Sequence, residues 1–549
     1  MKRILFLVSL MLLINIQFAN AQGWEWAKSD GDGFNVGGKI VKTDKAGFVY
    51  ELGYVPSTLG GPNALGILFE KYDSYGNQIW YKLIGGNNTA SEVFGTSMSI
   101  DAYGDIYITG YYYGSVSFDL ITFSSAQASL FLLKYDNSGN MIWVKNVAGI
   151  GSDFYNYSIC CTNDQIGNVY VAGNFIDSAI NIGSTTLTND SSGFADIFLA
   201  KFDSAGNVLW AKSAGGKLDD YPLSMTCDLN SRLYVTGAFK STEITFDSIT
   251  FSNNSNSNSN FFIVKYDSSG NTIWGKTGID TNYSVANSVN TDATGNVLIA
   301  GEFKQNITFG TTILNAGIFA SGLNMFIAKY DSIGNELWAR SATCSNCKTS
   351  AQSVITDLKG NAYLVGNEGI ATLYDTTIID APIFLIKYDS SGNVIWAAGG
   401  DGCNADIAVS SVALDTANNL YVTGTYQSVF NPPHTHIPSY AFFGETTITN
   451  YIFSGSFLFL AKFNERTLSL PINKEKINYI KLLPNPAYST VTINSIEQIS
   501  SLTITNLLGQ TVFSNSFHLN EVSVDVSQLP NGLYFVTINS TEVRKFVKQ

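Results

Sequence analysis

Short runs of alternating apolar and polar residues fill the chain from residue 24 to residue 464, and turn-forming residues separate them. Four kinds of run follow one another in a fixed order, and residues 353–357, 419–424, 326–330 and 208–212 are one example of each in turn. All four kinds are rich in β-branched and aromatic residues, which is typical of β-strands. The pattern therefore predicts an all-β protein built from four-stranded units.

A ten-residue motif marks the third and fourth strands of each unit. It reads Lys, Tyr or Phe, Asp, two variable residues, Gly, Asn, two variable residues and Trp, and its copies begin at Lys71, Lys134, Lys201, Lys265, Lys329 and Lys387. The Trp residues of these copies recur every 58 to 67 residues. A near-fixed period identifies a repeat architecture, and four-stranded antiparallel units are typical of β-propellers. We expect the Trp and the Tyr or Phe of each copy to fill the space between adjacent blades.

The two ends of the repeat region complement each other. A seventh copy of the motif stops after residues 462–464 (KFN), so the last unit lacks its Trp strand. A matching strand lies near the N-terminus, because residues 24–29 (WEWAKS) resemble residues 210–213 (WAKS). The sequence therefore predicts a seven-bladed β-propeller over residues 22–464 that is closed by its N-terminal strand, an arrangement that leaves no exposed sheet edge.

Two tight turns in each unit share an Asp-x-x-Gly frame, in which Asp caps a type I turn and Gly takes the left-handed conformation. In the turn between the first and second strands, Ser231 and Asn418 replace this Gly in two units. A string such as Asp-x-Ser-Gly-Asn also resembles part of a calcium loop, although an EF-hand loop continues to a Glu at its twelfth position. Turn formation accounts for every residue of the string. We therefore expect no cofactor, and calcium is the one ion that the motif leaves open.

The repeats resemble the bacterial β-propeller repeat family of the SBBP kind over residues 24–464. The ten-residue motif that begins at Lys71 and its further copies carry this resemblance. It implies the propeller fold, and it implies no defined activity.

The first residues have the form of a secretory signal peptide. A basic start and an apolar run at residues 4–14 are followed by Ala-Asn-Ala. We expect cleavage between Ala21 and Gln22, which removes residues 1–21. The apolar run is too short to span a bilayer, and no later stretch is predicted to be a transmembrane segment.

After about residue 477 the pattern changes to short alternating strands with Gly and Pro turns. It predicts a small Ig-like β-sandwich over residues 479–549, which follows a linker at residues 465–478. The sandwich residues resemble the C-terminal sorting domain of the type IX secretion system, at Pro484, Asn485, Pro486, Gly509, Gly532, Tyr534 and Lys545. This resemblance implies export through the periplasm to the cell surface or the extracellular space, with the type IX secretion machinery as a partner. An adhesive Ig-like module with the same strand pattern is the alternative.

Charge and cysteine content exclude two classes of protein. The formal net charge is -13 and no basic cluster is present, so we expect no nucleic-acid partner. Six Cys residues are too few for a disulfide scaffold in a chain of 549 residues. Cys344 and Cys347 are spaced for a local disulfide, a redox pair or half a zinc site. Because no second pair and no neighbouring His supports the last two, we expect the disulfide.

The longer connections, between strands two and three and between successive units, share one end of the predicted propeller. Binding residues are commonly found on variable loops held by a rigid scaffold. Asp219 and Asp220 lie on such a connection, and His434 and His436 form a His-x-His pair on the long connection of the last unit. These four are the candidate metal ligands. Solvated acids and a contact loop stiffened by Pro are the alternatives.

Motifs for catalysis are missing from the sequence, which has three His, no nucleophile elbow and no phosphate-binding loop. The leading hypothesis is an exported, non-catalytic binding or adhesion module with a glycan or another surface protein as its ligand. The alternative is a hydrolase or lyase that acts on extracellular polysaccharide through acids such as Asp219 and Asp220. A structural spacer of the cell envelope is the third hypothesis.

Overall fold

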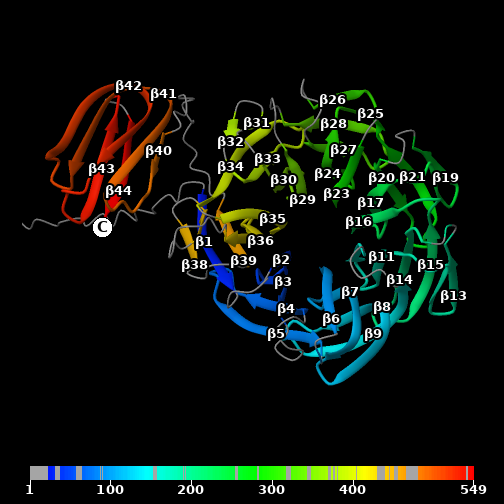
Figure 1. The fold of residues 1–549 in the computed structure, drawn as a ribbon. Coiled ribbons are helices and arrows are strands. Elements are labelled where there is room, and N and C mark those ends of the chain that lie inside the picture. The colour runs from blue at the N-terminus through cyan, green and yellow to red at the C-terminus, as the bar shows by residue number, and fades with distance from the viewer. Residues whose placement is uncertain are drawn as a thin grey trace, which may run out of the picture. The chain divides into compact units, whose positions relative to one another are not determined.

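The computed structural model describes residues 23–464 and 480–549, except 31–36, 57–64, 87, 89–90, 152–156, 190, 192, 254–257, 281–282, 317–322, 343–347, 369–371, 375–376, 380, 404, 429–438, 444–445, 451–455 and 540–541. Every regular element in these residues is a β-strand, as the sequence predicts (Figure 1). The chain divides into two compact units, residues 1–467 and residues 468–549. Each unit is described by itself below.

The first unit consists of antiparallel sheets built from groups of four strands, in which the first strand pairs with the second, the second with the third and the third with the fourth. The first strands are β2 (Gly37–Thr43), β6 (Glu92–Ile100), β10 (Ile159–Asn163), β16 (Asp220–Cys227), β23 (Tyr283–Thr291), β29 (Ser350–Thr356) and β35 (Ala405–Leu414). The second strands are β3 (Val49–Pro56), β7 (Ile106–Phe118), β11 (Val169–Phe175), β17 (Leu233–Phe239), β24 (Val297–Lys304), β30 (Ala362–Asn367) and β36 (Leu420–Ser428). The third strands are β4 (Leu65–Tyr72), β8 (Ile121–Tyr135), β14 (Asp196–Phe202), β20 (Asn260–Tyr266), β27 (Asn324–Tyr330), β33 (Ile383–Tyr388) and β39 (Ser456–Asn464). The fourth strands are β5 (Gln78–Gly86), β9 (Met141–Gly151), β15 (Val208–Ala214), β21 (Thr272–Thr277), β28 (Glu336–Ser341), β34 (Val394–Cys403) and, from the N-terminus, β1 (Gly23–Asp30).

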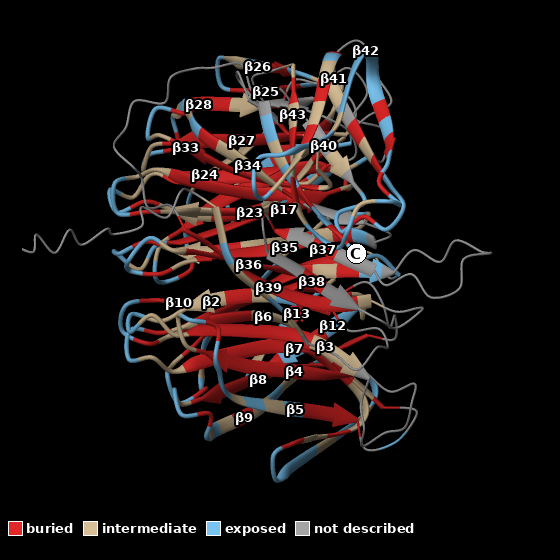
Figure 2. Cartoon of the chain, turned by 90° about the vertical axis from the view of Figure 1, so that its left-hand side faces the viewer, coloured by how far each residue is buried: buried red, intermediate tan, exposed pale blue. Residues whose placement is uncertain are grey.

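The first strands form the inner wall of a ring. Each of them contacts the first strand of the next sheet, from β2 through β6, β10, β16, β23 and β29 to β35, and β35 contacts β2 again (Figure 1). Buried side chains fill the space between successive sheets, so that Tyr170 and Leu199 of one sheet pack in a single cluster with Val235 and Phe262 of the next. Buried residues lie along most of the length of the strands in the ring (Figure 2). This all-β arrangement of radial antiparallel sheets is propeller-like.

The N-terminal strand belongs to the same sheet as the last strands of the ring. β1 pairs antiparallel with β39, and the order of that sheet is β1-β39-β36-β35. β1 thus takes the place of the fourth strand, which carries the motif Trp in the other sheets. Its Trp26 ring lies against Gly76 in a turn of the first sheet, and the Lys462 Nζ donates a hydrogen bond to the Ser74 carbonyl of that turn over 3.0 Å.

The ten-residue motif fastens each sheet to the following one. The Trp274 indole donates to the Ser332 carbonyl over 3.2 Å, and the Lys265 ammonium donates to the same oxygen over 2.6 Å. The next copy repeats the Trp contact, from Trp338 to Ser390 over 3.0 Å. The expected place of the Trp between sheets is therefore confirmed, and the motif Lys contributes a second, buried contact.

The tight turns have the predicted geometry. In the turn that begins at Asp292, the carboxylate accepts hydrogen bonds from the backbone N–H groups of Thr294 and Asn296, both over 3.0 Å. Ser231 and Asn418 replace the usual Gly and have φ angles of 58° and 62°. Both lie in the left-handed region that this turn position requires.

Between the second and third strands, the structure contains short hairpins where the sequence analysis expects only a variable connection. They are β12 (Ala179–Ile182) with β13 (Thr185–Thr188), β18 (Glu243–Phe246) with β19 (Ile249–Ser252), β25 (Asn306–Phe309) with β26 (Thr312–Asn315), β31 (Thr372–Tyr374) with β32 (Thr377–Ile379), and β37 (Ser439–Phe443) with β38 (Thr446–Asn450). Their inward residues, such as Ile244, Phe246 and Phe251, join the hydrophobic core. β25 also pairs with β22 (Ile279–Asp280), which follows the fourth strand of the preceding sheet. These hairpins therefore extend the contact between neighbouring sheets.

The described residues of the second unit form five strands. They are β40 (Ile480–Leu483), β41 (Thr490–Asn506), β42 (Thr511–Asp525), β43 (Gly532–Ile538) and β44 (Glu542–Lys548). Register shifts interrupt the pairing of β41 with β42 after Asn494. β41 pairs with β40 up to Ser495 and with β43 from Leu502 onwards, and both parts contribute to one core that includes Ile493 and Ile504.

Candidate functional site

The two acids predicted as metal ligands at the start of β16 have partners within the protein. The Asp219 carboxylate forms an ion pair with the Lys240 ammonium over 3.1 Å and accepts a hydrogen bond from the Ala195 N–H over 3.2 Å. Asp220 is fully buried. Its carboxylate accepts the Ser241 hydroxyl over 2.8 Å and the N–H groups of Lys240 and Ser241 over 3.1 and 3.2 Å. Asp220 therefore offers no surface that a polysaccharide could reach.

Burial raises the pKa of Asp220 to about 7, and the nearby Asp196 carboxyl acts in the same direction, while the hydrogen bonds from Ser241 and Lys240 oppose both effects. The folded protein therefore keeps a proton on Asp220 at pH values where the unfolded chain, with an ordinary pKa of 3.8, has released it. The stability that this proton provides is present below pH 4 and is lost as the pH rises towards 7.

We predict that Asp220→Asn removes this pH dependence. The wild-type free energy of unfolding should fall with a slope of up to about 1.4 kcal/mol per pH unit between pH 4 and 7 from this one group. The Asn variant should lack that component, because its side chain does not ionise. All 8 Trp residues lie in the first unit, so urea unfolding followed by Trp fluorescence measures the slope. Equal slopes for the two proteins would contradict the assignment.

Several predicted sites fall outside the described residues. They are the signal peptide with its cleavage point at Ala21 and Gln22, the His434 and His436 pair, the Cys344 and Cys347 pair, and the linker at residues 465–478. Within the described part of the chain, Cys160, Cys161 and Cys227 are free thiols. The same part contains no cluster of three or more His, Cys, Asp and Glu side chains able to hold a metal ion.

The sorting-motif residues hold the C-terminal strand of the second unit in place. The Asn485 side chain accepts a hydrogen bond from the Val547 N–H over 2.8 Å and donates to the Lys545 carbonyl over 3.3 Å. The Tyr534 hydroxyl donates to the Pro530 carbonyl over 2.8 Å, and its ring stacks on Phe546 with 5.4 Å between the ring centroids. Gly509 adopts a φ of 77° in the turn between β41 and β42. In this unit the motif positions therefore have structural roles.

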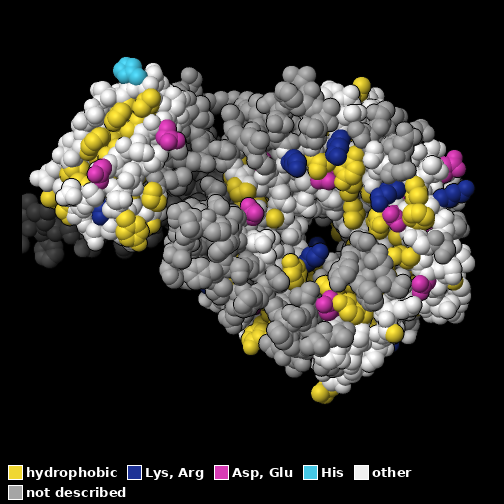
Figure 3. All heavy atoms as spheres, viewed as in Figure 1, with side chains coloured by type: hydrophobic (Ala, Val, Ile, Leu, Met, Phe, Trp, Pro, Cys, Tyr) yellow, Lys and Arg dark blue, Asp and Glu magenta, His cyan; other side chains and the backbone are white. Residues whose placement is uncertain are grey.

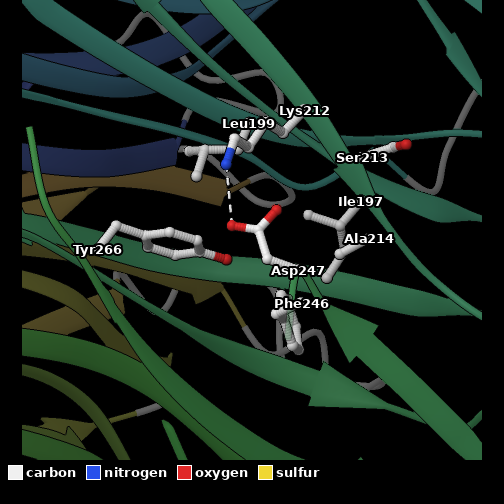
Figure 4. A pocket seen from close by; sticks show the side chains of 8 residues that line it. All are labelled: Ile197, Leu199, Lys212, Ser213, Ala214, Phe246, Asp247 and Tyr266. Atoms are coloured by element: carbon white, nitrogen blue, oxygen red, sulfur yellow. Dashed lines mark hydrogen bonds and ion pairs between the residues drawn. The ribbon is translucent and has the colours of Figure 1, made fainter. Parts of the chain in front are cut away.

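Two hollows on the first unit are poor ligand sites. In the first, the Lys212 and Asp247 side chains form an ion pair over 2.9 Å beside Tyr266, and the space of about 10 Å³ is the size of one water molecule (Figure 4). The second has a volume of about 270 Å³. It lies between the turns at Asp292 and Gly360, each of which joins the first and second strands of its sheet. Of the charged residues that line it, Asp292 and Lys329 are already paired with each other over 2.9 Å, and Lys359 is the third.

The first sheet departs from the other sheets at its core. Glu51 on β3 and Glu70 on β4 are buried and face each other in register, whereas the corresponding second and third strands in the rest of the ring carry Ile, Val, Leu or Ala at both positions. The Glu51 carboxylate accepts a hydrogen bond from the Thr423 hydroxyl of the last sheet. The Glu70 carboxylate accepts one from the Gln78 amide over 2.6 Å. The first sheet therefore contains two buried carboxyl groups, and one of them is hydrogen-bonded to the last sheet.

The inner wall of the ring also differs at the first sheet. A β-bulge inserts one extra residue into most first strands, and that residue is Thr96 in β6, Asn287 in β23 and Gln352 in β29. In β2 the extra residue is Lys39, and Lys42 follows three positions later. These two are the only basic residues in the described parts of the first strands. Atoms of Lys or Arg side chains are visible at the central opening of the ring (Figure 3).

The end of the ring that carries the tight turns is partly apolar. Large hydrophobic side chains in these turns are exposed, namely Tyr75, Tyr103, Ile166, Leu229, Ile333 and Leu358.

In the described residues, no helix is long and apolar enough to cross a membrane.

Comparisons with known proteins identify the second unit. Residues 481–549 match the family described as secretion system C-terminal sorting domain. This type IX sorting domain shows that the chain is exported to the cell surface or the extracellular space.

Over the rest of the chain the similarities are distant. An uncharacterized WD repeat-containing protein, L264 of Acanthamoeba polyphaga mimivirus, is 24% identical over 379 residues, which are 56% of this chain and 27% of the relative. The regulatory protein FlaEY of Caulobacter vibrioides is 29% identical over 116 residues, which are 21% of this chain and 12% of the relative. The chain thus spans about a quarter or less of these curated relatives. The crystal structure of polysaccharide lyase Uly1 aligns with 10% identity and a TM-score of 0.40, over 80% of this chain and 99% of that chain.

Proposed function

We propose that this chain is an exported, non-catalytic binding module, in which a seven-bladed β-propeller of the SBBP kind binds a glycan or another surface protein. The propeller would comprise residues 22–464 and be joined by residues 465–478 to an Ig-like sorting domain. The type IX secretion machinery would recognise this domain and deliver the protein. A signal peptide at residues 1–21 would direct the first step of export.

The asymmetry of the ring supports this proposal most strongly. At one end, every sheet ends in turns held by the same hydrogen bonds, such as the bond of Gly295 N–H to the Asp292 carbonyl over 3.0 Å. At the other end, the connections between sheets differ in length and sequence. Variable connections on a rigid scaffold are the usual place for binding residues. We name this end the loop face and the opposite end the turn face.

The geometry favours binding over polysaccharide cleavage. Glycoside hydrolysis requires two carboxyl groups that reach the scissile bond. Asp220 is fully buried, and Asp219 is occupied by Lys240. These acids therefore support a structural role, and we keep the hydrolase or lyase only as an outcome of the test.

A glycan array paired with a turnover assay on the full mature chain tests the proposal. We expect retention of one glycan class without release of shorter products. A triple variant of the turn face, Tyr103→Ser, Ile166→Ser and Leu229→Ser, is the matched control and should bind as the wild type does. Product release would support the enzyme instead, and silence across glycans and surface proteins would support the spacer. Loss of binding in the control would place the ligand on the turn face and contradict the proposal.

A further inference from the structure

The inner wall of the ring places two lysines at different depths of one opening. Lys39 is the bulge residue of β2, near the strand end that joins the loop-face connection, and Lys42 lies near the end that joins the Asp44 turn. Because a strand rises about 3.3 Å per residue, their Cα atoms are about 10 Å apart along the wall. The opening therefore has one cation near the loop face and one deeper inside.

Lys42 is half-buried on β2, a strand of the inner wall. It interacts electrostatically with Cys161 on β10, which is not the next sheet but the one after it. The intervening strand β6 contacts both β2 and β10. On the opposite side of β2, Val41 packs into a core with Ala413 and Leu460 of the last sheet.

Both lysines are partly desolvated. Burial lowers the pKa of Lys39 although its side chain reaches solvent, as expected for a group inside a narrow opening, and burial also lowers the pKa of Lys42. No described carboxylate forms an ion pair with either ammonium. The acids on described first strands, Glu92, Asp220 and Asp406, all lie at or next to the loop-face ends of their strands.

The surrounding wall supplies neutral polar groups. The bulge residues Thr96, Asn287 and Gln352 are half-buried around the ring. A belt of Ser hydroxyls below them accepts backbone N–H groups of the next first strand, as from Val289 to Ser224 over 3.2 Å and from Val354 to Ser288 over 3.1 Å. This belt fixes the inner wall, and Lys39 and Lys42 are the basic residues on the described parts of its strands.

We propose that the central opening is an oxyanion site, in which Lys39 and Lys42 bind carboxylate or sulfate groups of an acidic glycan that enters from the loop face. This inference rests on the proposed glycan-binding function and narrows it to acidic glycans. An oxyanion would supply a counter-charge that the described residues do not provide to these two ammonium groups, in a protein whose overall charge is -13. The overall negative charge would repel a polyanion elsewhere on the surface, so recognition would be confined to the opening.

Calorimetric titration of the full mature chain tests this site. The probes are an oligogalacturonate, a neutral malto-oligosaccharide of equal length, sodium sulfate and hexaglutamate. We expect the oligogalacturonate to bind, and Lys39→Gln with Lys42→Gln to weaken its binding at least about tenfold. Lys217→Gln with Lys348→Gln is the charge-matched control, because both lysines are exposed on connections between sheets. The control should bind within about twofold of the wild type.

The outcomes separate this inference from the proposed function. Binding of sulfate alone would support the oxyanion site and assign it to free anions. Equal weakening in both double variants, or preference for hexaglutamate, would overturn the acidic-glycan site. If the wild type and both double variants bind the neutral malto-oligosaccharide and none binds oligogalacturonate, this inference is overturned and the proposed function stays intact. Unchanged thermal unfolding of the Lys39 and Lys42 variant would verify that it folds, because neither side chain forms an ion pair with a described residue.

Discussion

Deletion of residues 22–30 is expected to destabilise the first unit by about 5 kcal/mol or more, because β1 completes the last sheet and no other strand takes its place. The deletion removes Trp24, whose indole donates to the Gly399 carbonyl over 3.2 Å, and Trp26, which lies against Gly76. It also exposes the edge of β39 along its length, and exposed edges promote aggregation. Thermal unfolding followed by Trp fluorescence measures the loss.

A point variant in the same strand controls for changes near the N-terminus. Lys28 is exposed, so Lys28→Gln should change the free energy of unfolding by no more than about 0.5 kcal/mol. If the deletion variant unfolds at the same temperature as the wild type, β1 is not the strand that closes the ring.

The second large effect is expected at a buried ion pair of the repeat motif. The Lys329 ammonium lies 2.9 Å from the Asp292 carboxylate, and the two side chains are 2% and 3% exposed. Lys329 also donates to the Gly360 carbonyl of the next sheet over 3.3 Å. Lys329→Met leaves a buried carboxylate without its cation, so we expect a loss of about 3–5 kcal/mol in the free energy of unfolding.

The Lys212 and Asp247 pair is the matched control, since the distance is also 2.9 Å while the side chains are 30% and 36% exposed. Lys212→Met should cost no more than about 1 kcal/mol, because solvent screens the pair. Urea unfolding of both variants at pH 7 gives the comparison. Similar losses at the two sites would show that burial does not control the contribution of these lysines. Asp292→Asn in the Lys329→Met background should recover part of the loss.

Features that depend on local sequence could be predicted. The Asp-x-x-Gly turns follow from the conformational preferences of Asp and Gly, and they include the left-handed Ser231 and Asn418. The place of Trp274 and its counterparts follows from their period. The hairpins such as β18–β19 were missed, although Ile244, Phe246 and Phe251 alternate with polar residues. Each run is only four residues long, which is too short to stand out from a variable connection.

The inner wall could not be predicted from the sequence. The sequence does not tell that Lys39 and Lys42 lie on a strand that borders a central opening. That position becomes clear only when β2, β35 and the strands between them form one ring. Likewise, Asp219 and Asp220 are adjacent in sequence, but β16 begins between them and separates an ion-paired side chain from a buried one. A departure from the repeat consensus in a single unit was the available signal, as with Glu51 and Glu70, where the other units carry aliphatic residues.

Hydrogen exchange of the β1 backbone amides tests the closed ring most directly, because it needs no substitution. β1 pairs with β39 from Gly23 opposite Asn464 to Asp30 opposite Leu458. We therefore predict that the hydrogen-bonded amides of residues 24–30 exchange as slowly as those of β39, in the same cooperative unit. Exchange at the rate of an unstructured peptide, while β39 stays protected, would contradict closure by the N-terminal strand.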